Sequence, residues 1–360
     1  MAVQGGMLRL ARQRLRLTQK EAAKRLGIRQ PILSRYENAT IEADDEFAGR
    51  AAQVYGVPIG FLEQLDPIYG PPVSVHPMTR KKSNVTAREL DAIMAELNIR
   101  TMHIRRLLEG VEFTPTSDVP QLDIDQYESP ASVAGLLRAH WGVPSGPIHD
   151  LTALVEKAGT IIVLSPLGNA SVSGVTYKVP GQPPLIALAD HQPADRLRFT
   201  LAHELGHLVM HRFPTSEMED EANAFAAAFL MPEQDIRPSF AGRRIDLALL
   251  ASLKPEWKVA MQALLVRASS LGYLKPNQSR YLWQQISARG MRLKEPPELD
   301  FPHEEPQIMS LIIGGHLEDL GYSIEEIAEL LNLHTDQIRD LYRLWEKPIP
   351  PERPRLRIVK

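Results

Sequence analysis

Apolar positions along the chain follow helical spacing at both ends and strand spacing only in the middle. Three short segments rich in β-branched residues, each bounded by Gly or Pro, are predicted as strands: 160–164, 171–178 and 184–188. Helical patterns lie before them at 131–141 and 147–158 and after them at about 193–212 and 217–231, and the remainder to Leu344 also reads as helical. Short helices are also predicted throughout 7–65, including 44–55 and 58–65. This order predicts a multidomain protein, with an all-α bundle followed by an α+β domain and a helical C-terminal region.

Breaks in the pattern divide the 360 residues into four predicted parts. The second part begins rich in Pro and Gly, becomes basic, contains one strongly helical stretch at 87–108 and ends in loop-like sequence, so we interpret it as a linker or arm. The predicted parts are an N-terminal bundle at 1–65, this linker at 66–129, the α+β domain at 130–295 and a helical region at 296–360. The last part contains a second helix–turn–helix spacing at 323–342 and a tail at 347–360 that is too rich in Pro for a helix.

Composition excludes several classes of site. The chain has no Cys, so disulfides, thiolate zinc sites, iron–sulfur centres and cysteine nucleophiles are ruled out, and a metal site must use His and carboxylate ligands. No apolar stretch reaches about 18 residues and the N-terminus lacks the apolar core of a secretory signal, so we expect no membrane span and a cytoplasmic location. The net charge of −3 conceals a basic end, because residues 1–36 contain nine Lys or Arg and one acid. That excess favours binding to a polyanion.

The basic end contains a helix–turn–helix pattern. Thr18 is the predicted N-cap of a helix over 18–26, Glu21 completes a capping box with it, and Gly27 ends the helix in a tight turn. A second helix over 30–38 tolerates Pro31 in its first turn.

This layout allows the second helix to enter the major groove of DNA. Gln30 and Arg35 suit base edges, Gln toward adenine and Arg toward guanine. Gln19 is expected to donate to a phosphate, and Arg29 and Asn38 are expected to hold the DNA backbone. The alternative is a small helical bundle whose basic face is merely solvated.

The strongest chemical motif is His203-Glu204-Leu205-Gly206-His207, within a predicted helix. Two His four residues apart lie on one helical face, so both imidazoles can bind one Zn²⁺. Glu204 would then accept the proton of a water molecule that zinc activates for attack on a carbonyl. A surface helix with two His is the alternative, but the surrounding Leu and Val pattern indicates a buried face.

The third metal ligand has several candidates. His211 is eight residues from the first His of the motif, about 12 Å along the helix and too far for one ion. The position that would supply a His in metzincins is Phe213. Glu219 and Glu221 remain, at the start of the next helix; we favour Glu219, because Asn223 lies four residues later and could bond a ligating imidazole. Glu221 stays open as the alternative.

Residues 18–38, TQKEAAKRLGIRQPILSRYEN, resemble the Cro/C1-type (XRE) helix–turn–helix at its Thr-Gln, Ala, Leu-Gly, Gln, Ser and Glu-Asn positions. The resemblance adds Ser34 to the expected DNA contacts. Two residues depart from the family pattern: Ala39 replaces the Gly usual after Asn, and Pro31 replaces a side chain that could read a base.

The segments DRLRFTLAHELGHLVMH and EDEANAFAAAFLMP resemble the ImmA/IrrE family of metallopeptidases, and with its flanks this resemblance covers about 145–290. It implies a gluzincin-like zincin fold with one Zn²⁺ per chain, bound by His203, His207 and Glu219, and with Glu204 as catalytic base. Members of the family are associated with cleavage of a cognate Cro/C1-type repressor. The family also has helix–turn–helix-like segments after the peptidase core, as expected here at 246–271 and 323–342.

Together these features predict a DNA-binding transcriptional regulator whose zinc endopeptidase domain cleaves a partner protein. Its expected partners are a double-stranded DNA operator, a protein substrate of the Cro/C1 repressor type, and a second copy of the chain, since such domains usually read paired half-sites. The segment 171–178 is one candidate for an edge strand that pairs with an extended substrate; 184–188 or a purely structural hairpin are the alternatives. The alternative function is a regulator whose metal site is structural or metal-sensing, without proteolysis.

Overall fold

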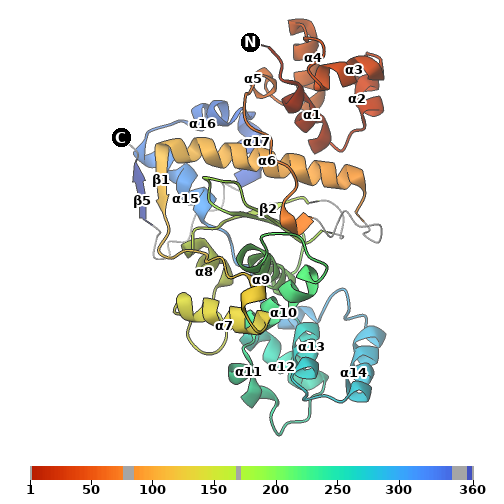
Figure 1. Cartoon of the computed structure of the whole chain (residues 1–360), viewed down its shortest axis with the longest axis vertical. Helices are drawn as coiled ribbons and strands as arrows, with labels where there is room; N and C mark the ends of the chain where they lie inside the picture. Colours follow the sequence, from red (N-terminus) through yellow and green to blue (C-terminus); the bar gives the residue numbers. More distant parts are fainter. Residues whose placement is uncertain (1, 76–84, 168–171, 343–354, 359–360) are drawn as a thin grey trace.

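The computed structural model describes residues 2–75, 85–167 and 172–342, and the backbone of 355–358. In Figure 1 a helical bundle forms one end of the molecule, one long helix crosses beneath it, a small sheet with its helices lies in the centre, and further helices form the other end. The observed folding units are thus a helical N-terminal bundle and a mixed sheet covered by helices.

The N-terminal bundle consists of α1 (Gly5–Arg14), α2 (Gln19–Arg25), α3 (Gln30–Glu37), α4 (Asp45–Tyr55) and α5 (Ile59–Leu62). The predicted capping box of α2 is confirmed, because Thr18 N–H donates to Glu21 Oε2 at 2.8 Å and Glu21 N–H donates to Thr18 Oγ1 at 3.2 Å. The turn at Gly27 is also confirmed, with a φ of +70°. Buried Glu37 accepts two bonds from Arg12, at 2.5 and 2.9 Å, which ties the end of α3 to α1.

The long helix is α6 (Ala87–Gly110), which confirms the helical stretch expected inside the linker. It is buried on two sides. Ala95, Ile99 and Met102 pack into the core of the N-terminal bundle. Other apolar residues of α6, namely Ile93, Leu97, Ile104 and Leu107, pack into the core on one face of the sheet. The segment interpreted as an arm therefore contains a helix that both halves of the molecule share.

The central sheet has the order β2–β4–β3, formed by β2 (Ile161–Ser165), β4 (Leu185–Ala189) and β3 (Gly174–Tyr177). β2 pairs with β4 in parallel, and β3 pairs with β4 antiparallel, with Val175 opposite Ala187. All three predicted strands are present, although Ser171 lies outside the described residues. The segment 184–188 lies in the central strand, so its interpretation as a sheet edge is wrong; β3 is an outer strand of the described sheet.

Side chains of the sheet alternate between two cores, as expected for a period of two. Ile162 and Ile186 face α9 (Ala194–Met210) and α10 (Met218–Leu230), whereas Ile161 and Val175 face α6. The first of these cores also includes α7 (Pro130–His140), α8 (Leu151–Lys157), α11 (Glu233–Phe240), α12 (Leu247–Trp257), α13 (Met261–Ser270) and α14 (Pro276–Ala288). Both predicted helices that follow the strands are therefore confirmed, and they form one side of the sheet's covering.

The region after α14 corrects one expectation. Residues 289–307 are mostly non-helical, with a single 3₁₀ turn at Pro297–Leu299, because the prolines at 296, 297, 302 and 306 cannot continue a helix. The chain becomes helical again at α15 (Ile308–Gly314), continues through a π-helical turn (Gly315–Asp319), and then forms α16 (Ile324–Leu331) and α17 (Thr335–Tyr342). In the described part of the chain, no helix combines the length and the apolar character needed to cross a lipid bilayer.

A two-stranded sheet lies outside what the sequence pattern predicted. β1 (Val111–Thr114) pairs antiparallel with β5 (Arg355–Ile358), with Val111 opposite Ile358. β5 belongs to the Pro-rich tail, of which residues 347–354 and 359–360 lie outside the described residues. The tail was expected only to be non-helical, and its described segment is a strand.

The second helix–turn–helix spacing does form two helices, α16 and α17, but they are packed against the rest of the protein. Tyr342 Oη lies 2.8 Å from Nδ1 of buried His103 on α6, and the Arg100 guanidinium lies over the Tyr342 ring, 5.0 Å from its centroid. Gln337 Nε2 donates to Gly56 O of the N-terminal bundle at 3.0 Å. The pair thus joins α6 and the N-terminal bundle.

Candidate metal centre

The two His of the motif meet because α9 is helical over the whole motif. The Nε2 atoms of His203 and His207 lie 3.0 Å apart. Glu219, in the first turn of α10, places Oε1 3.2 Å from His207 Nε2 and Oε2 3.7 Å from His203 Nε2. One ligand atom from each of the three residues lies within 4.8 Å of the others, so the cluster has the compactness of a metal site.

The second nitrogen of each His is held by a neighbour. Asn223 Oδ1 lies 3.0 Å from His203 Nδ1, at the position expected from the sequence. His207 Nδ1 lies 3.0 Å from His211 Nδ1, and His211 Nε2 lies 3.1 Å from Glu221 Oε2. Partners of this kind fix the tautomer and orientation of a ligating imidazole.

His211 and Glu221 therefore have a place that sequence reasoning missed. The sequence suggested both only as possible metal ligands. In the structure His211 contacts His207 on the side away from the cluster, and Glu221 contacts His211 in turn. The signal was present in the spacing, since His203, His207 and His211 repeat every four residues on one face of the helix.

The charge states of the cluster suit a metal. Burial lowers the pKa of His203, against the opposing charge of Glu204, and so favours a neutral imidazole with a free lone pair. Burial alone would raise the pKa of Glu219, but the hydrogen bond and charge of His207 and the charge of His203 lower it overall, which favours the carboxylate. Neutral imidazole and ionised carboxylate are the forms in which these side chains bind Zn²⁺. The residues present therefore fit this ion.

Glu204 is buried between α9 and β3. Thr176 Oγ1 lies 2.8 Å from Glu204 Oε2 and 2.9 Å from the backbone oxygen of Glu204. The close approach requires Gly174, because a Cβ at that position would lie 2.9 Å from Glu204 Cγ. The outer strand of the sheet thus holds the carboxylate that the motif predicts as the base.

Two cavities adjoin the cluster along β3. A cavity of about 270 Å³ is lined by His203, Glu204 and Glu219 together with Gly174. A cavity of about 700 Å³ is lined by His207 and His211 together with Thr176, and carries the cationic side chains Lys178 and Arg212. The cluster therefore lies between two spaces that follow one outer strand.

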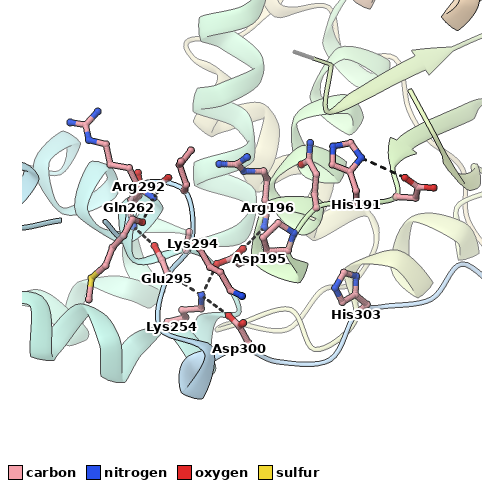
Figure 2. A pocket seen from close by; sticks show the side chains of 16 residues that line it. His191, Asp195, Arg196, Lys254, Gln262, Arg292, Lys294, Glu295, Asp300 and His303 are labelled. Atoms are coloured by element: carbon pink, nitrogen blue, oxygen red, sulfur yellow. Dashed lines mark hydrogen bonds and ion pairs between the residues drawn. The ribbon is translucent and has the colours of Figure 1, made fainter. Parts of the chain in front are cut away.

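The first turn of α9 is anchored by buried ion pairs, which Figure 2 shows beside a pocket of about 640 Å³. Lys254 of α12 lies 2.7 Å from Asp195 of α9, 3.0 Å from Glu295 and 3.3 Å from Asp300. Lys254 and Asp195 are both buried, so removing either one would leave an unpaired buried charge, and their ion pair ties the start of α9 to α12.

The predicted DNA-facing residues lie on and beside α3. Gln30 Nε2 donates to Gln19 Oε1 at 2.7 Å, so the structure brings these two side chains together. Gln19 in turn donates to Glu37 Oε2 at 2.8 Å. Arg29 and Arg35 are exposed, as an interface with DNA requires.

The end of α3 holds the other two predicted contacts. Asn38 Nδ2 lies 3.4 Å from half-buried Ser34 Oγ, and Asn38 Oδ1 accepts a bond from Arg9 at 2.8 Å. Asn38 itself is exposed. Ala39, where the family pattern usually has Gly, has a left-handed φ of +51°.

Comparison with protein families matches these two regions separately. Residues 8–62 match a helix-turn-helix family model, and residues 155–269 match the model of the IrrE N-terminal-like domain in the Peptidase_M78 family. No curated protein matches the chain. Both resemblances drawn from the sequence are thereby confirmed: the chain is a fusion of a Cro/C1-type helix-turn-helix domain with an IrrE-like peptidase domain.

Proposed function

We propose that this protein is a DNA-binding transcriptional regulator whose IrrE-like domain is a zinc-dependent endopeptidase that cleaves a partner protein. The observation that carries the proposal is the cluster of His203, His207 and Glu219 beside Glu204, between two cavities that follow β3. An endopeptidase needs room for a polypeptide on both sides of the scissile bond, and the two cavities beside the cluster offer such room.

In the proposed site, His203, His207 and Glu219 hold one zinc ion per chain. Zinc supplies Lewis acidity, which activates water and polarises a carbonyl oxygen. Asn223 orients His203, and the pair His211–Glu221 orients His207.

Glu204 accepts the proton of the attacking water, and Thr176 fixes its carboxylate through the bond of 2.8 Å. The metal-binding carboxylate comes from the helix after the HExxH helix, which supports a gluzincin-like arrangement. Among the described residues the cluster offers three protein ligands, whereas a closed structural zinc site has four, and this supports a catalytic role over a structural or sensing one.

In the other half, we propose that α3 enters the major groove of an operator. Gln30 and Arg35 would contact base edges, and Gln19, Arg29, Ser34 and Asn38 would contact the DNA backbone. We further propose that two copies bind paired half-sites and that the cleaved partner is a repressor of the same helix-turn-helix type.

The decisive experiment compares the zinc-loaded protein with Glu204→Gln on candidate repressors encoded near its gene. We expect Glu204→Gln to lower the cleavage rate by roughly 10² to 10⁴, because a general base contributes about that factor, while its zinc content stays unchanged. Glu325→Gln, which changes an exposed carboxylate of α16, is the matched control and should cleave normally. Equal cleavage by Glu204→Gln, or no cleavage of any repressor by the unaltered protein while it still binds its operator, would contradict the proposal.

A further inference from the structure

Residues 69–75, which follow the N-terminal bundle, cross the outer edge of the sheet, and we call them the strap. Figure 1 shows this segment descending from α5 past α6 toward the sheet. At its start, Tyr69 N–H donates to Asn98 Oδ1 of α6 at 2.7 Å and Tyr69 O accepts from Asn98 Nδ2 at 3.1 Å. At its end, Val75 is fully buried in the core beside the sheet. The strap is therefore fixed at both ends.

Ser74 of the strap occupies the edge of β3 that faces away from β4. Ser74 Oγ donates to Thr176 O at 3.1 Å and accepts from Thr176 N–H at 3.2 Å. Ser74 is only 5% exposed. Tyr177 Oη adds a longer bond to Gly70 O, at 3.4 Å. One side chain of the strap thus satisfies both backbone groups that Thr176 presents away from β4.

This contact lies at the metal cluster. Thr176 is the residue whose hydroxyl bonds the Glu204 carboxylate. The strap residues Pro71 to Ser74 also line the cavity of about 700 Å³ that His207 and His211 line. An extended polypeptide that passed along β3 would use the backbone groups of Thr176, since strand addition depends on such bonds.

We propose that the strap is a gate: Ser74 holds the backbone groups of β3 that an extended polypeptide needs, so a substrate adds to this edge only after Ser74 leaves it. The inference rests on the proposed function, because it takes β3 as the edge along which the substrate lies. Two consecutive prolines, Pro71 and Pro72, stiffen the strap and favour its extended shape. The strap follows the N-terminal bundle along the chain, so it connects the bundle with the cavity of about 700 Å³ beside the metal cluster.

Binding without cleavage tests the gate. The parent is the full-length, zinc-loaded Glu204→Gln protein, and the probe is fluorescein-labelled β-casein, an unfolded polypeptide, followed by fluorescence anisotropy. In this background Ser74→Ala should bind the probe at least about fivefold more tightly, because two hydrogen bonds that compete with the probe are gone. Pro71→Gly/Pro72→Gly, which keeps Ser74 but loosens the strap, should also bind more tightly. Ser252→Ala on α12, whose hydroxyl donates to Leu249 O at 2.8 Å, is the matched control and should not change the affinity.

Amide exchange locates the effect. With Ser74→Ala, saturating β-casein should slow hydrogen exchange at the Thr176 amide, whereas exchange in the parent should change little. Unchanged affinity in both strap variants, or tighter binding with no protection of Thr176, would overturn the gate. Neither readout requires catalysis, so a failure of repressor cleavage would reject the peptidase proposal while leaving this result interpretable.

Discussion

The metal cluster and the DNA-facing surface present their polar side chains in opposite ways. In the cluster, His203, His207 and Glu219 lie against one another, and each His has a second partner behind it. On the DNA-facing surface, Arg29 and Arg35 extend into solvent. The first region is thus organised throughout by contacts within the protein, whereas in the second Gln19, Gln30 and Asn38 have such contacts but the two arginines are exposed. Substitutions should therefore act through geometry in the cluster and through lost contacts on the surface.

The two helix–turn–helix pairs make a second contrast. Both begin with a capping box, at Thr18 in α2 and at Ser323 in α16. The first pair is basic, but the second exposes five acids on α16 and α17, namely Glu325, Glu326, Glu329, Asp336 and Asp340. The second pair is also docked on α6 through Tyr342. The two segments thus share a local sequence pattern and form similar helix pairs. They differ in surface charge and in how they pack against the rest of the protein.

The largest effect is expected behind the cluster. His211→Ala should weaken zinc binding by about 10- to 100-fold, because His207 loses the partner that orients it, and Glu221→Gln should have a smaller effect in the same direction. A competition titration against a zinc-chelating dye measures both. His303→Ala, at an exposed His, is the control. Unchanged zinc affinity in His211→Ala would show that the metal ligands do not depend on the residues behind them. The proposed difference between the metal cluster and the DNA-facing surface would then be wrong.

On the DNA-facing surface, Arg35→Ala should cost about 1 to 3 kcal/mol of binding free energy at the operator and relax base discrimination. Arg339→Ala, at the exposed Arg of α17, should leave operator binding unchanged. The helix pair α16–α17 exposes mostly acidic side chains and is packed against α6. Footprinting and binding titrations over the chain's own promoter at fixed salt compare the two. An equal loss with Arg339→Ala would make α16–α17 a second DNA-binding pair.

Local patterns predicted most of the elements because they depend on neighbours in sequence. The capping box at Thr18, the strands and the HExxH helix follow from spacing alone. The different positions of Glu219 and Glu221 also follow from helical phase: two residues apart, they turn to different sides of α10, one toward the cluster and the other toward His211.

Contacts between distant segments could not be read in this way. Ser74 and Thr176 are 102 residues apart, and the short alternating patterns of β1 (VEFT) and β5 (RLRI) do not identify the strand with which each pairs. No motif in the sequence marks Lys254, and only the fold buries it beside three carboxylates. His211 is a different case, because it is only four residues from His207 and the spacing itself could have indicated their contact.

The docking of α17 on α6 should make stability depend on pH. Burial, and then the charge of Arg100, lower the pKa of His103 well below its usual value. His103 therefore stays neutral in the folded protein, while the unfolded chain binds a proton below about pH 6.5, so stability is lost as the pH falls through that value. Between pH 7.5 and 5.5 the free energy of unfolding should fall by roughly 1 kcal/mol, and His103→Gln should abolish this part of the pH dependence. Urea denaturation of both proteins at the two pH values measures the difference, and identical pH dependence would contradict it.

The smallest effect concerns the end of the DNA-facing helix. Ala39 has a left-handed φ of +51°, which costs an L-residue roughly 1 kcal/mol relative to Gly. Ala39→Gly should therefore raise the free energy of unfolding by about 1 kcal/mol without changing zinc affinity. Ala241→Gly is the control, since Ala241 has an ordinary φ of −63° and should gain nothing. Urea denaturation checks both, and a destabilised Ala39→Gly would contradict the strain.

Helix α6 has a consequence for how the fusion can be taken apart. Its Ala95, Ile99 and Met102 complete the core of the bundle, and its opposite side completes the core beside the sheet. A cut between residues 65 and 87 would leave the bundle without part of its interior and would expose an apolar stripe on what remains. The two halves are therefore expected to melt in one cooperative transition. In recombination between genes, this helix would have to travel with both of its neighbours, so the helix-turn-helix domain and the IrrE-like domain are inherited as one piece.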